Sequence, residues 1–296
     1  MSEPALPDLL QAGSERLLAM HRAQVHRAPW PDPEVFDPAR YPRELRRAAA
    51  VQWAGRARAE YGSVHQFTQV AHALCVARVP LTLFGSLARL ITDEVRHAEL
   101  CAATALAIDP EATARTLRLP SPRTPWKAPP LGDAREPLLA WASRAILVAC
   151  CLGETLSRPM LEAIALRATD PLPQGVADQI LRDEHLHATF GWEALAALWP
   201  ELSDASRTRL QRTLTQALGD FEASTACGIP VEALVGKELE IDADPDTPNL
   251  GTLSDEDYAA IFFATVEHEI LPKLEAQGLD AGRAWAERPR PTPART

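Results

Sequence analysis

The spacing of apolar residues predicts helices along most of the chain. From Pro42 onward, apolar side chains recur three, four and seven residues apart, as they do on helices with one buried face. Four long helices are expected over about 42–78, 80–108, 135–167 and 173–198, and two more over about 203–226 and 254–278. Few stretches are rich in β-branched residues, so the sequence predicts an all-α fold.

The connections predict how these helices are arranged. Short turns join the first helix to the second and the third to the fourth, so each pair should form an antiparallel hairpin. Residues 109–134 contain six prolines and no steady periodicity, which indicates a long crossover between the hairpins. We therefore expect an N-terminal leader (1–42), a four-helix bundle (43–200) and a C-terminal helical extension (201–296).

Three details of these segments are also predicted. The leader should hold a short amphipathic helix near 5–20 followed by a proline-rich segment. Pro159 should kink the third long helix, and Ser254 should cap the last one. The final ten residues, ERPRPTPART, are polar and proline-rich, and we expect them to be disordered.

Composition narrows the classes of partner. The formal net charge is -10 and no strongly basic run occurs, which argues against nucleic acid as the main partner. The five cysteines are odd in number and fit buried thiols in a reducing cytoplasm better than a disulfide framework. The N-terminus lacks the pattern of a signal peptide. The most apolar stretch, 138–152, is too short for a membrane span and contains Arg144, so we expect a cytoplasmic protein without a membrane partner.

Two of the predicted helices carry the same polar motif on an otherwise apolar face. The second helix contains Asp93-Glu94-Val95-Arg96-His97-Ala98, and the fourth contains Asp183-Glu184-His185-Leu186-His187-Ala188. A Glu and a His three residues apart lie on one face of a helix. A single Glu-x-x-His arises readily by chance, whereas two with the same flanking residues do not. His185 should point away from this face.

The first and third helices each place one acid on an apolar face, Glu60 and Glu154. Glu60 precedes Glu94 by 34 residues and Glu154 precedes Glu184 by 30, so each acid should lie level with the motif of its own hairpin. Four carboxylates and two imidazoles would then converge in the core. Such a cluster is unfavourable without cations, and two divalent ions would balance the four negative charges.

This set of residues resembles the ligands of the ferritin-like di-iron carboxylate proteins. The matching residues, in order, are Glu60, Glu94, His97, Glu154, Glu184 and His187. The resemblance covers about 43–199 and implies a ferritin-like four-helix bundle with one long crossover. It also implies a cofactor of two iron ions, with a mixed manganese–iron pair as an alternative.

The resemblance suggests roles for further residues. Asp93 would orient His187, and Asp183 would orient His97. Ser157 matches the position where soluble desaturases of this group keep a hydroxyl near the metals, where it would deliver protons; a small core residue is the alternative. Arg158 would pair with an acid or with a substrate carboxylate.

Departures from the better-known members leave the activity open. Cys101 stands where reductase subunits place a radical tyrosine, and Ile180 stands where some N-oxygenases add a histidine. The paired Cys-x-x-Cys motifs of rubrerythrins do not occur. Glu99 is expected on the helix surface. No sequence pattern indicates a function for His21 or His26 in the leader.

The function expected from the resemblance is a di-iron oxidase or oxygenase that uses O₂ to hydroxylate, desaturate or N-oxidise a small organic substrate. The C-terminal helices would cover a substrate pocket. Because no reductase motif is present, a separate electron donor should be required. Two alternatives remain, a ferroxidase or peroxide-consuming iron protein, and a ferritin-like interaction module. A homodimer is one possible assembly, but nothing in the extension predicts it.

Overall fold

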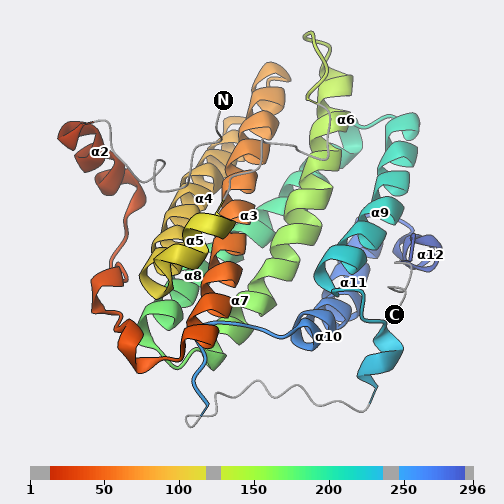
Figure 1. Cartoon of the computed structure of the whole chain (residues 1–296). Coiled ribbons are helices and arrows are strands. Elements are labelled where there is room, and N and C mark those ends of the chain that lie inside the picture. Colours follow the sequence, from red (N-terminus) through yellow and green to blue (C-terminus); the bar gives the residue numbers. More distant parts are fainter. Residues whose placement is uncertain (1–13, 118–127, 236–246, 291–296) are drawn as a thin grey trace.

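The computed structural model describes residues 14–117, 128–235 and 247–290, and these residues form helices and loops with no strand among them (Figure 1). The all-α prediction is therefore confirmed. Four long helical rods dominate: α3 (Arg43–Val76), α4 (Leu81–Ile108), the rod formed by α6 (Arg135–Ile146), η3 (Leu147–Glu154) and α7 (Thr155–Arg167), and α8 (Pro171–Leu198). Their ends lie within one helical turn of the predicted boundaries.

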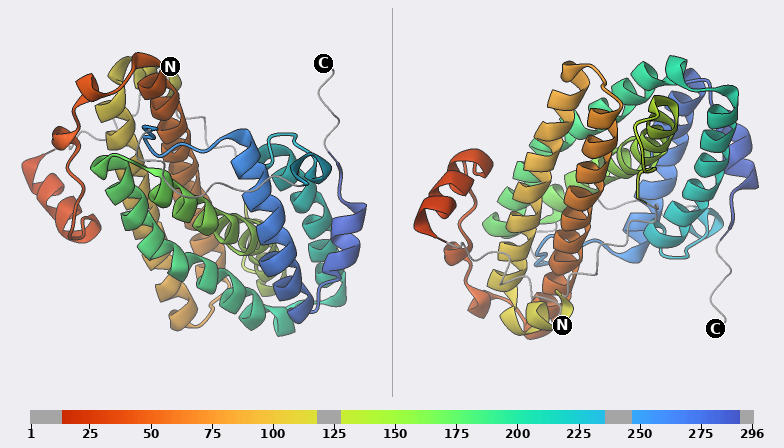
Figure 2. Two further views of the ribbon diagram at one scale, coloured as in Figure 1. Left: turned by 90° about the horizontal axis from the view of Figure 1, so that it is seen from below. Right: turned by 90° about the horizontal axis from the view of Figure 1, so that it is seen from above.

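The four rods pack side by side in a closed arrangement. Helix α3 contacts α4, α4 contacts α8, α8 contacts the α6–α7 rod, and α6 returns to α3. Figure 2 shows the rods along two further directions. Short turns at residues 77–80 and 168–170 join α3 to α4 and the α6–α7 rod to α8, as an antiparallel hairpin requires.

The apolar interior of these rods is divided into two clusters. One is built around Phe67, Leu74, Leu90, Leu147 and Phe190. The other is built around Trp53, Ala57, Leu100, Leu161 and Ile180. On α4, Leu90 belongs to the first cluster and Leu100 to the second, and the polar residues Glu94 and His97 lie between them. The polar motif therefore interrupts the core at mid-height.

The α6–α7 rod contains an irregularity that the periodicity did not predict. Residues Leu147–Glu154 are π-helical, and Glu154 is the last of them. Single-turn π segments inside α-helices are frequent at functional sites. Pro159, for which we predicted a kink, lies inside α7. By length and composition alone the rod Arg135–Arg167 could cross a membrane, but 78% of its most apolar window is buried inside the protein.

The C-terminal helices lie on the opposite side of the rods from α2 (Figures 1 and 2). They are η4 (Trp199–Glu201), α9 (Asp204–Thr225), η5 (Val231–Leu234), α10 (Asp255–Thr265), η6 (Val266–Ile270), α11 (Leu271–Ala276) and α12 (Ala281–Glu287). Ser254 caps α10 in a capping box with Asp257, as predicted. The sequence did not predict α12.

The start of the expected disordered tail is ordered. Arg288 is buried, and its guanidinium donates to both carboxylate oxygens of Glu222 on α9, at 2.5 and 2.9 Å. This ion pair fixes residues that we predicted to be disordered from their composition alone. Residues 291–296 lie outside the described part of the chain.

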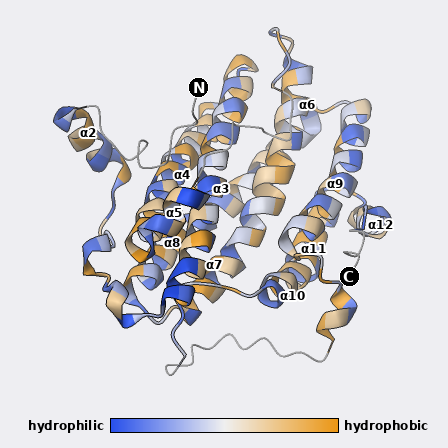
Figure 3. Ribbon diagram, in the orientation of Figure 1, coloured by the Kyte–Doolittle hydropathy of each residue, from blue (hydrophilic) through white to orange (hydrophobic). Residues whose placement is uncertain are grey.

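The prediction for the leader can be compared only in part. Helix α2 (Glu15–Val25) ends later than the expected helix near 5–20, and the part of that prediction over 5–13 lies outside the described residues. Two short 3₁₀ helices follow, η1 (Pro33–Val35) and η2 (Pro38–Arg40). The crossover contains a short helix, α5 (Pro110–Thr116), capped by Asp109. Figure 3 shows that hydrophilic residues are more frequent on α2 and α9 than on the α6–α7 rod.

Candidate metal centre

The six residues that resemble metal ligands meet at the polar layer between the two apolar clusters. Glu60 comes from α3, Glu94 and His97 from α4, Glu154 from the end of η3, and Glu184 and His187 from α8. Glu94, His97, Glu184 and His187 are at most 1% exposed. The Glu154 side chain is 10% exposed and that of Glu60 is 15% exposed.

Two of the glutamates face both histidines. One oxygen of Glu94 lies 3.0 Å from His187 Nδ1 and the other lies 4.0 Å from His97 Nδ1. One oxygen of Glu184 lies 3.5 Å from His97 Nδ1 and the other lies 3.9 Å from His187 Nδ1. Each of these carboxylates thus directs one oxygen to each imidazole, whose ring centroids are 5.4 Å apart.

The other two glutamates each face one histidine. Glu60 Oε2 lies 3.8 Å from His97 Nδ1, and Glu154 Oε2 lies 3.8 Å from His187 Nδ1. Glu60, His97 and Glu184 therefore form one group of donor atoms, and Glu154, His187 and Glu184 form a second. Within each group the atoms lie within 4.8 Å of one another, so either group could hold a metal ion.

Donor atoms at this layer are buried without hydrogen bonds. Among the described residues, both oxygens of Glu94, both oxygens of Glu184, and Nδ1 of His97 and His187 have no hydrogen-bond partner. An unsatisfied buried polar atom costs about 1–3 kcal/mol. Ligand atoms held about 2.1 Å from one metal ion lie about 3 Å or more apart, which matches the observed separations of 3.0–4.0 Å. The residues present therefore fit bound cations.

The electrostatics lead to the same conclusion. Burial, together with the negative charge of Glu154, raises the pKa of Glu94 and of Glu184 well above the usual range. Burial would also raise the pKa of Glu154, but interactions with His187 outweigh it and lower that pKa. Burial would lower the pKa of His187, but Asp93, Glu154 and Glu94 raise it well above its usual value. Without cations, these acids must share protons to remain in the core.

Each histidine turns its second nitrogen toward an aspartate of the opposite hairpin. His97 Nε2 is 3.4 Å from Asp183 Oδ2, within hydrogen-bond distance. His187 Nε2 is 3.6 Å from Asp93 Oδ2, which is an ion-pair separation rather than a hydrogen bond. These are the pairings that the family resemblance implies.

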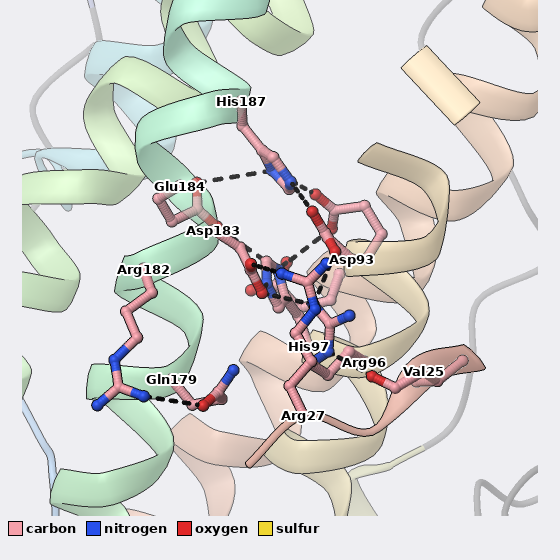
Figure 4. A network of polar contacts seen from close by, with 12 residues as sticks. Val25, Arg27, Asp93, Arg96, His97, Gln179, Arg182, Asp183, Glu184 and His187 are labelled. Atoms are coloured by element: carbon pink, nitrogen blue, oxygen red, sulfur yellow. Dashed lines mark hydrogen bonds and ion pairs between the residues drawn. The ribbon is translucent and has the colours of Figure 1, made fainter. Parts of the chain in front are cut away.

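Three arginines, none of which we singled out from the sequence, hold the two aspartates. They are Arg27, Arg89 and Arg96. Arg96 is fully buried, and its Nη1 donates to Asp93 at 2.7 Å and to Asp183 at 2.5 Å. Figure 4 shows its guanidinium between the two aspartates and close to Val25.

The other two guanidinium groups reach the same aspartates from less buried positions. Arg89 Nε donates to both oxygens of Asp93 at 2.7 Å, and its Nη2 donates to Asp183 at 3.2 Å. Arg27, from the leader, also donates to Asp183 at 3.2 Å. Burial would raise the pKa of Asp93, but His187, Arg89 and Arg96 outweigh it and hold that pKa far below its usual range. Burial would also raise the pKa of Asp183, but His97 and Arg96 lower it, so both aspartates are ionised.

Several other sequence predictions can be located. Ser157 is half-buried on the first turn of α7, and no hydrogen bond of its hydroxyl is found among the described residues. Arg158 pairs with acids, Glu162 at 2.9 Å and Glu269 at 2.7 Å. His185 is exposed, as expected from its position on the helix.

The cysteines and Glu99 require corrections. Cys101, Cys150 and Cys151 are buried, but Cys75 and Cys227 are exposed rather than part of the core. Glu99, which we expected on the helix surface, is half-buried. Its carboxylate is 22% exposed and contacts two leader histidines, which the sequence reasoning had set aside.

A pocket of about 500 Å³ lies between the α6–α7 rod and α9. Its lining includes Arg144 and Val148 of the rod and Arg209, Arg212 and Phe221 of α9. Phe221 packs over Gly153, the residue before Glu154, so that a Cβ atom at Gly153 would lie 3.8 Å from its ring. The extension thus forms one wall of a pocket that adjoins the π-helical segment.

Comparisons of the chain with protein-family models, with curated proteins and with solved structures found no match. The fold and the site by themselves define an all-helical protein with a buried carboxylate–histidine cluster that could hold metal.

Proposed function

We propose that this protein is a ferritin-like di-metal oxidase or oxygenase, which uses O₂ to oxidise a small organic substrate. The observation that carries the proposal is the convergence of four glutamates and two histidines. Among the described residues, the buried oxygens of Glu94 and Glu184 and the Nδ1 atoms of both histidines have no hydrogen-bond partner. A purely structural cluster would satisfy those atoms with other side chains, because each unsatisfied one is costly.

The distances support a role for each candidate ligand. Glu60 and His97 would hold one ion and Glu154 and His187 the other, while Glu94 and Glu184 would each offer one oxygen to the group around each histidine. Two divalent ions would neutralise the four carboxylates. Two ferrous ions, or a manganese–iron pair, would supply the electrons and the open coordination positions that O₂ reduction needs.

The surrounding residues prepare the histidines for this role. When Nε2 carries the proton and faces an aspartate, Nδ1 keeps the lone pair that a metal requires. Asp93 and Asp183 occupy these positions, and the arginines keep them charged. The two apolar clusters on either side limit the access of water to the site.

The pocket beside the π-helical segment suggests the class of substrate. Arg144, Arg209 and Arg212 line it, and Asp220 is its only acid among the described residues. The Nε atom of Arg144 is buried and has no hydrogen-bond partner within the described part of the chain. Guanidinium groups bind carboxylates and phosphates well. We therefore propose a small organic substrate with an apolar part and an anionic group.

Anaerobic reconstitution tests the proposed function. The metal-free chain would be loaded with ferrous iron, the iron counted, and a pulse of O₂ followed by optical spectroscopy and oxygen consumption. We expect loading to stop at two irons per chain and oxygen consumption to need an added electron donor for more than one turnover. Continued iron uptake after the pulse would indicate a ferroxidase instead. If the chain does not bind iron, the ferritin-like interaction module is the alternative that remains.

A further inference from the structure

A second cluster of metal-ligand residues lies outside the buried centre, where the leader meets α4. Glu99 follows His97 by two residues, so its side chain points about 200° around the helix, away from the buried centre. His21 lies on α2 and His26 follows the end of that helix. The two Nε2 atoms face different oxygens of the Glu99 carboxylate, at 2.8 and 3.0 Å.

These three side chains match a known type of cation site. Their donor atoms lie within 4.8 Å of one another. Two histidines and one glutamate form zinc sites in which a water completes the tetrahedron. Ligand atoms about 2.0–2.2 Å from such an ion are about 3.3 Å apart. The two His–Glu99 separations of 2.8 and 3.0 Å would need to lengthen by only a few tenths of an ångström to reach that value. The side chains are 22–33% exposed, which leaves space for that water.

The backbone that carries His26 is fixed by contacts that do not involve Glu99. Val25 is buried, and its carbonyl oxygen accepts a bond from Arg96 Nε at 2.5 Å. The His26 ring stacks on Trp30 with centroids 3.6 Å apart. His26 is therefore held in place before any ion binds, which reduces the entropy cost of binding.

We propose that His21, His26 and Glu99 bind one Zn²⁺ ion, with water as the fourth ligand, and that this ion fastens α2 to α4. Imidazole ligands favour zinc and similar transition ions over magnesium or calcium. The site is independent of the proposed oxidase function, because none of its three ligands belongs to the buried centre.

Zinc counting on the full chain tests the proposal. Metal-stripped protein would be dialysed against Zn²⁺, and zinc per chain measured for the wild type, His21→Ala/His26→Ala, and Glu99→Gln. The Gln side chain can still hydrogen-bond to both histidines and keep the leader docked, but it lacks the carboxylate. We expect both variants to lose one zinc per chain. His185→Ala, which removes an exposed histidine of α8, should lose none.

A spectroscopic measurement locates the ion. Because Trp30 stacks on His26, Ni²⁺ bound there should quench Trp30 fluorescence, and Trp30→Phe should remove that quenching. The quenching should persist in His97→Ala/His187→Ala, in which the buried centre is damaged. If Glu99→Gln binds as much zinc as the wild type and leaves the quenching unchanged, the cluster is only hydrogen-bonded and the proposal is wrong.

Discussion

The two hairpins carry the same motif but stabilise it by different means. On α4, Arg89 precedes Asp93 by four residues and Arg96 follows it by three, and both bond to it. The corresponding positions around Asp183 on α8 are Gln179 and Leu186. Asp183 instead takes its guanidiniums from α4 and the leader. The Asp-Glu-x-x-His motif is thus duplicated, whereas the guanidiniums that pair with its aspartates all come from α4 and the leader.

The lone glutamates show a second difference. Glu60 lies on the regular helix α3, whereas Glu154 ends the π-helical segment. Four residues after the histidines, the first hairpin has the buried Cys101 and the second has Gly191. The second hairpin therefore reaches the same arrangement through closer packing and an irregular helix.

Removing one histidine should have the largest effect, and it tests whether the hairpins are equivalent as ligands. His97→Ala and His187→Ala should each lose one iron ion per chain in anaerobic titration, because each histidine faces its own terminal glutamate. His185→Ala is the matched control on α8 and should bind iron like the wild type. If either of these two variants binds as much iron as the wild type, the histidine that it lacks is not an iron ligand.

Replacing the shared arginine should disturb both hairpins together. Arg96→Leu leaves two buried aspartates short of a partner, and breaking such a buried charge network costs roughly 3 kcal/mol or more. Urea unfolding of the metal-free protein would measure the loss. Arg182→Leu is the control, because Arg182 is exposed and its side chain bonds to Gln179 alone among the residues that the structure describes. Equal stability of the two variants would mean that Arg89 and Arg27 alone sustain the aspartates.

The aspartates themselves should behave alike if the pairing with the opposite histidines is what matters. Asp93→Ala and Asp183→Ala should each weaken iron binding by about 10- to 100-fold, the usual cost of freeing a ligating imidazole. Asp178→Ala, an exposed acid on α8, is the control. Glu99 cannot serve as that control, because it contacts His21 and His26. If Asp93→Ala binds iron like the wild type and Asp183→Ala binds it more weakly, only the shorter of the two aspartate–histidine contacts is functional.

Much of the fold and of the cluster could be predicted because both depend on local periodicity. The apolar repeat sets the long helices, and a Glu-x-x-His pair must share a face of whichever helix contains it. Glu60 and Glu154 were placed level with the motif of their own hairpin by counting the residues on either side of the hairpin turn. None of these steps needed the tertiary structure.

The rest depended on contacts between distant segments. Arg96 sits inside the motif, but its partners Asp183 and Val25 lie on other elements. The spacing of Arg89 and Asp93 was a readable signal of a local ion pair. No local pattern signals that His21 and His26 reach Glu99, since a leader helix can dock in many ways. The order of Arg288 likewise depends on Glu222, which is 66 residues away.

The close packing of the second hairpin gives the next prediction. A Cβ atom at Gly191 would lie 2.6 Å from Cys150 Cβ and 2.9 Å from its backbone carbon. Gly191→Ala should therefore push α8 away from the π-helical segment and destabilise the protein by about 1–3 kcal/mol. Gly175→Ala, on the same helix, meets only ordinary contacts with Pro31 and should be neutral or stabilising. Thermal unfolding would compare them.

The smallest effect concerns how the second helix of each hairpin begins. Helix α4 starts at Pro80 without a side-chain cap, whereas α8 is capped by Asp170. The Tyr41 hydroxyl donates to that carboxylate at 2.7 Å. Tyr41→Phe should cost about 1.5 kcal/mol, the worth of a hydrogen bond to a charged group. Tyr61→Phe is the control and should change stability by less than about 0.5 kcal/mol.

The pH dependence of that difference sharpens the test. Burial and the bond to Asp170 raise the pKa of Tyr41 from 10.0 to about 12. A group whose pKa is raised on folding stabilises the protein fully below its unfolded pKa and loses that contribution as the pH rises through the folded value. The gap in urea midpoint between wild type and Tyr41→Phe should therefore be constant up to about pH 9 and narrow above about pH 10. A gap that widens there instead would show that the phenol is not the donor to Asp170.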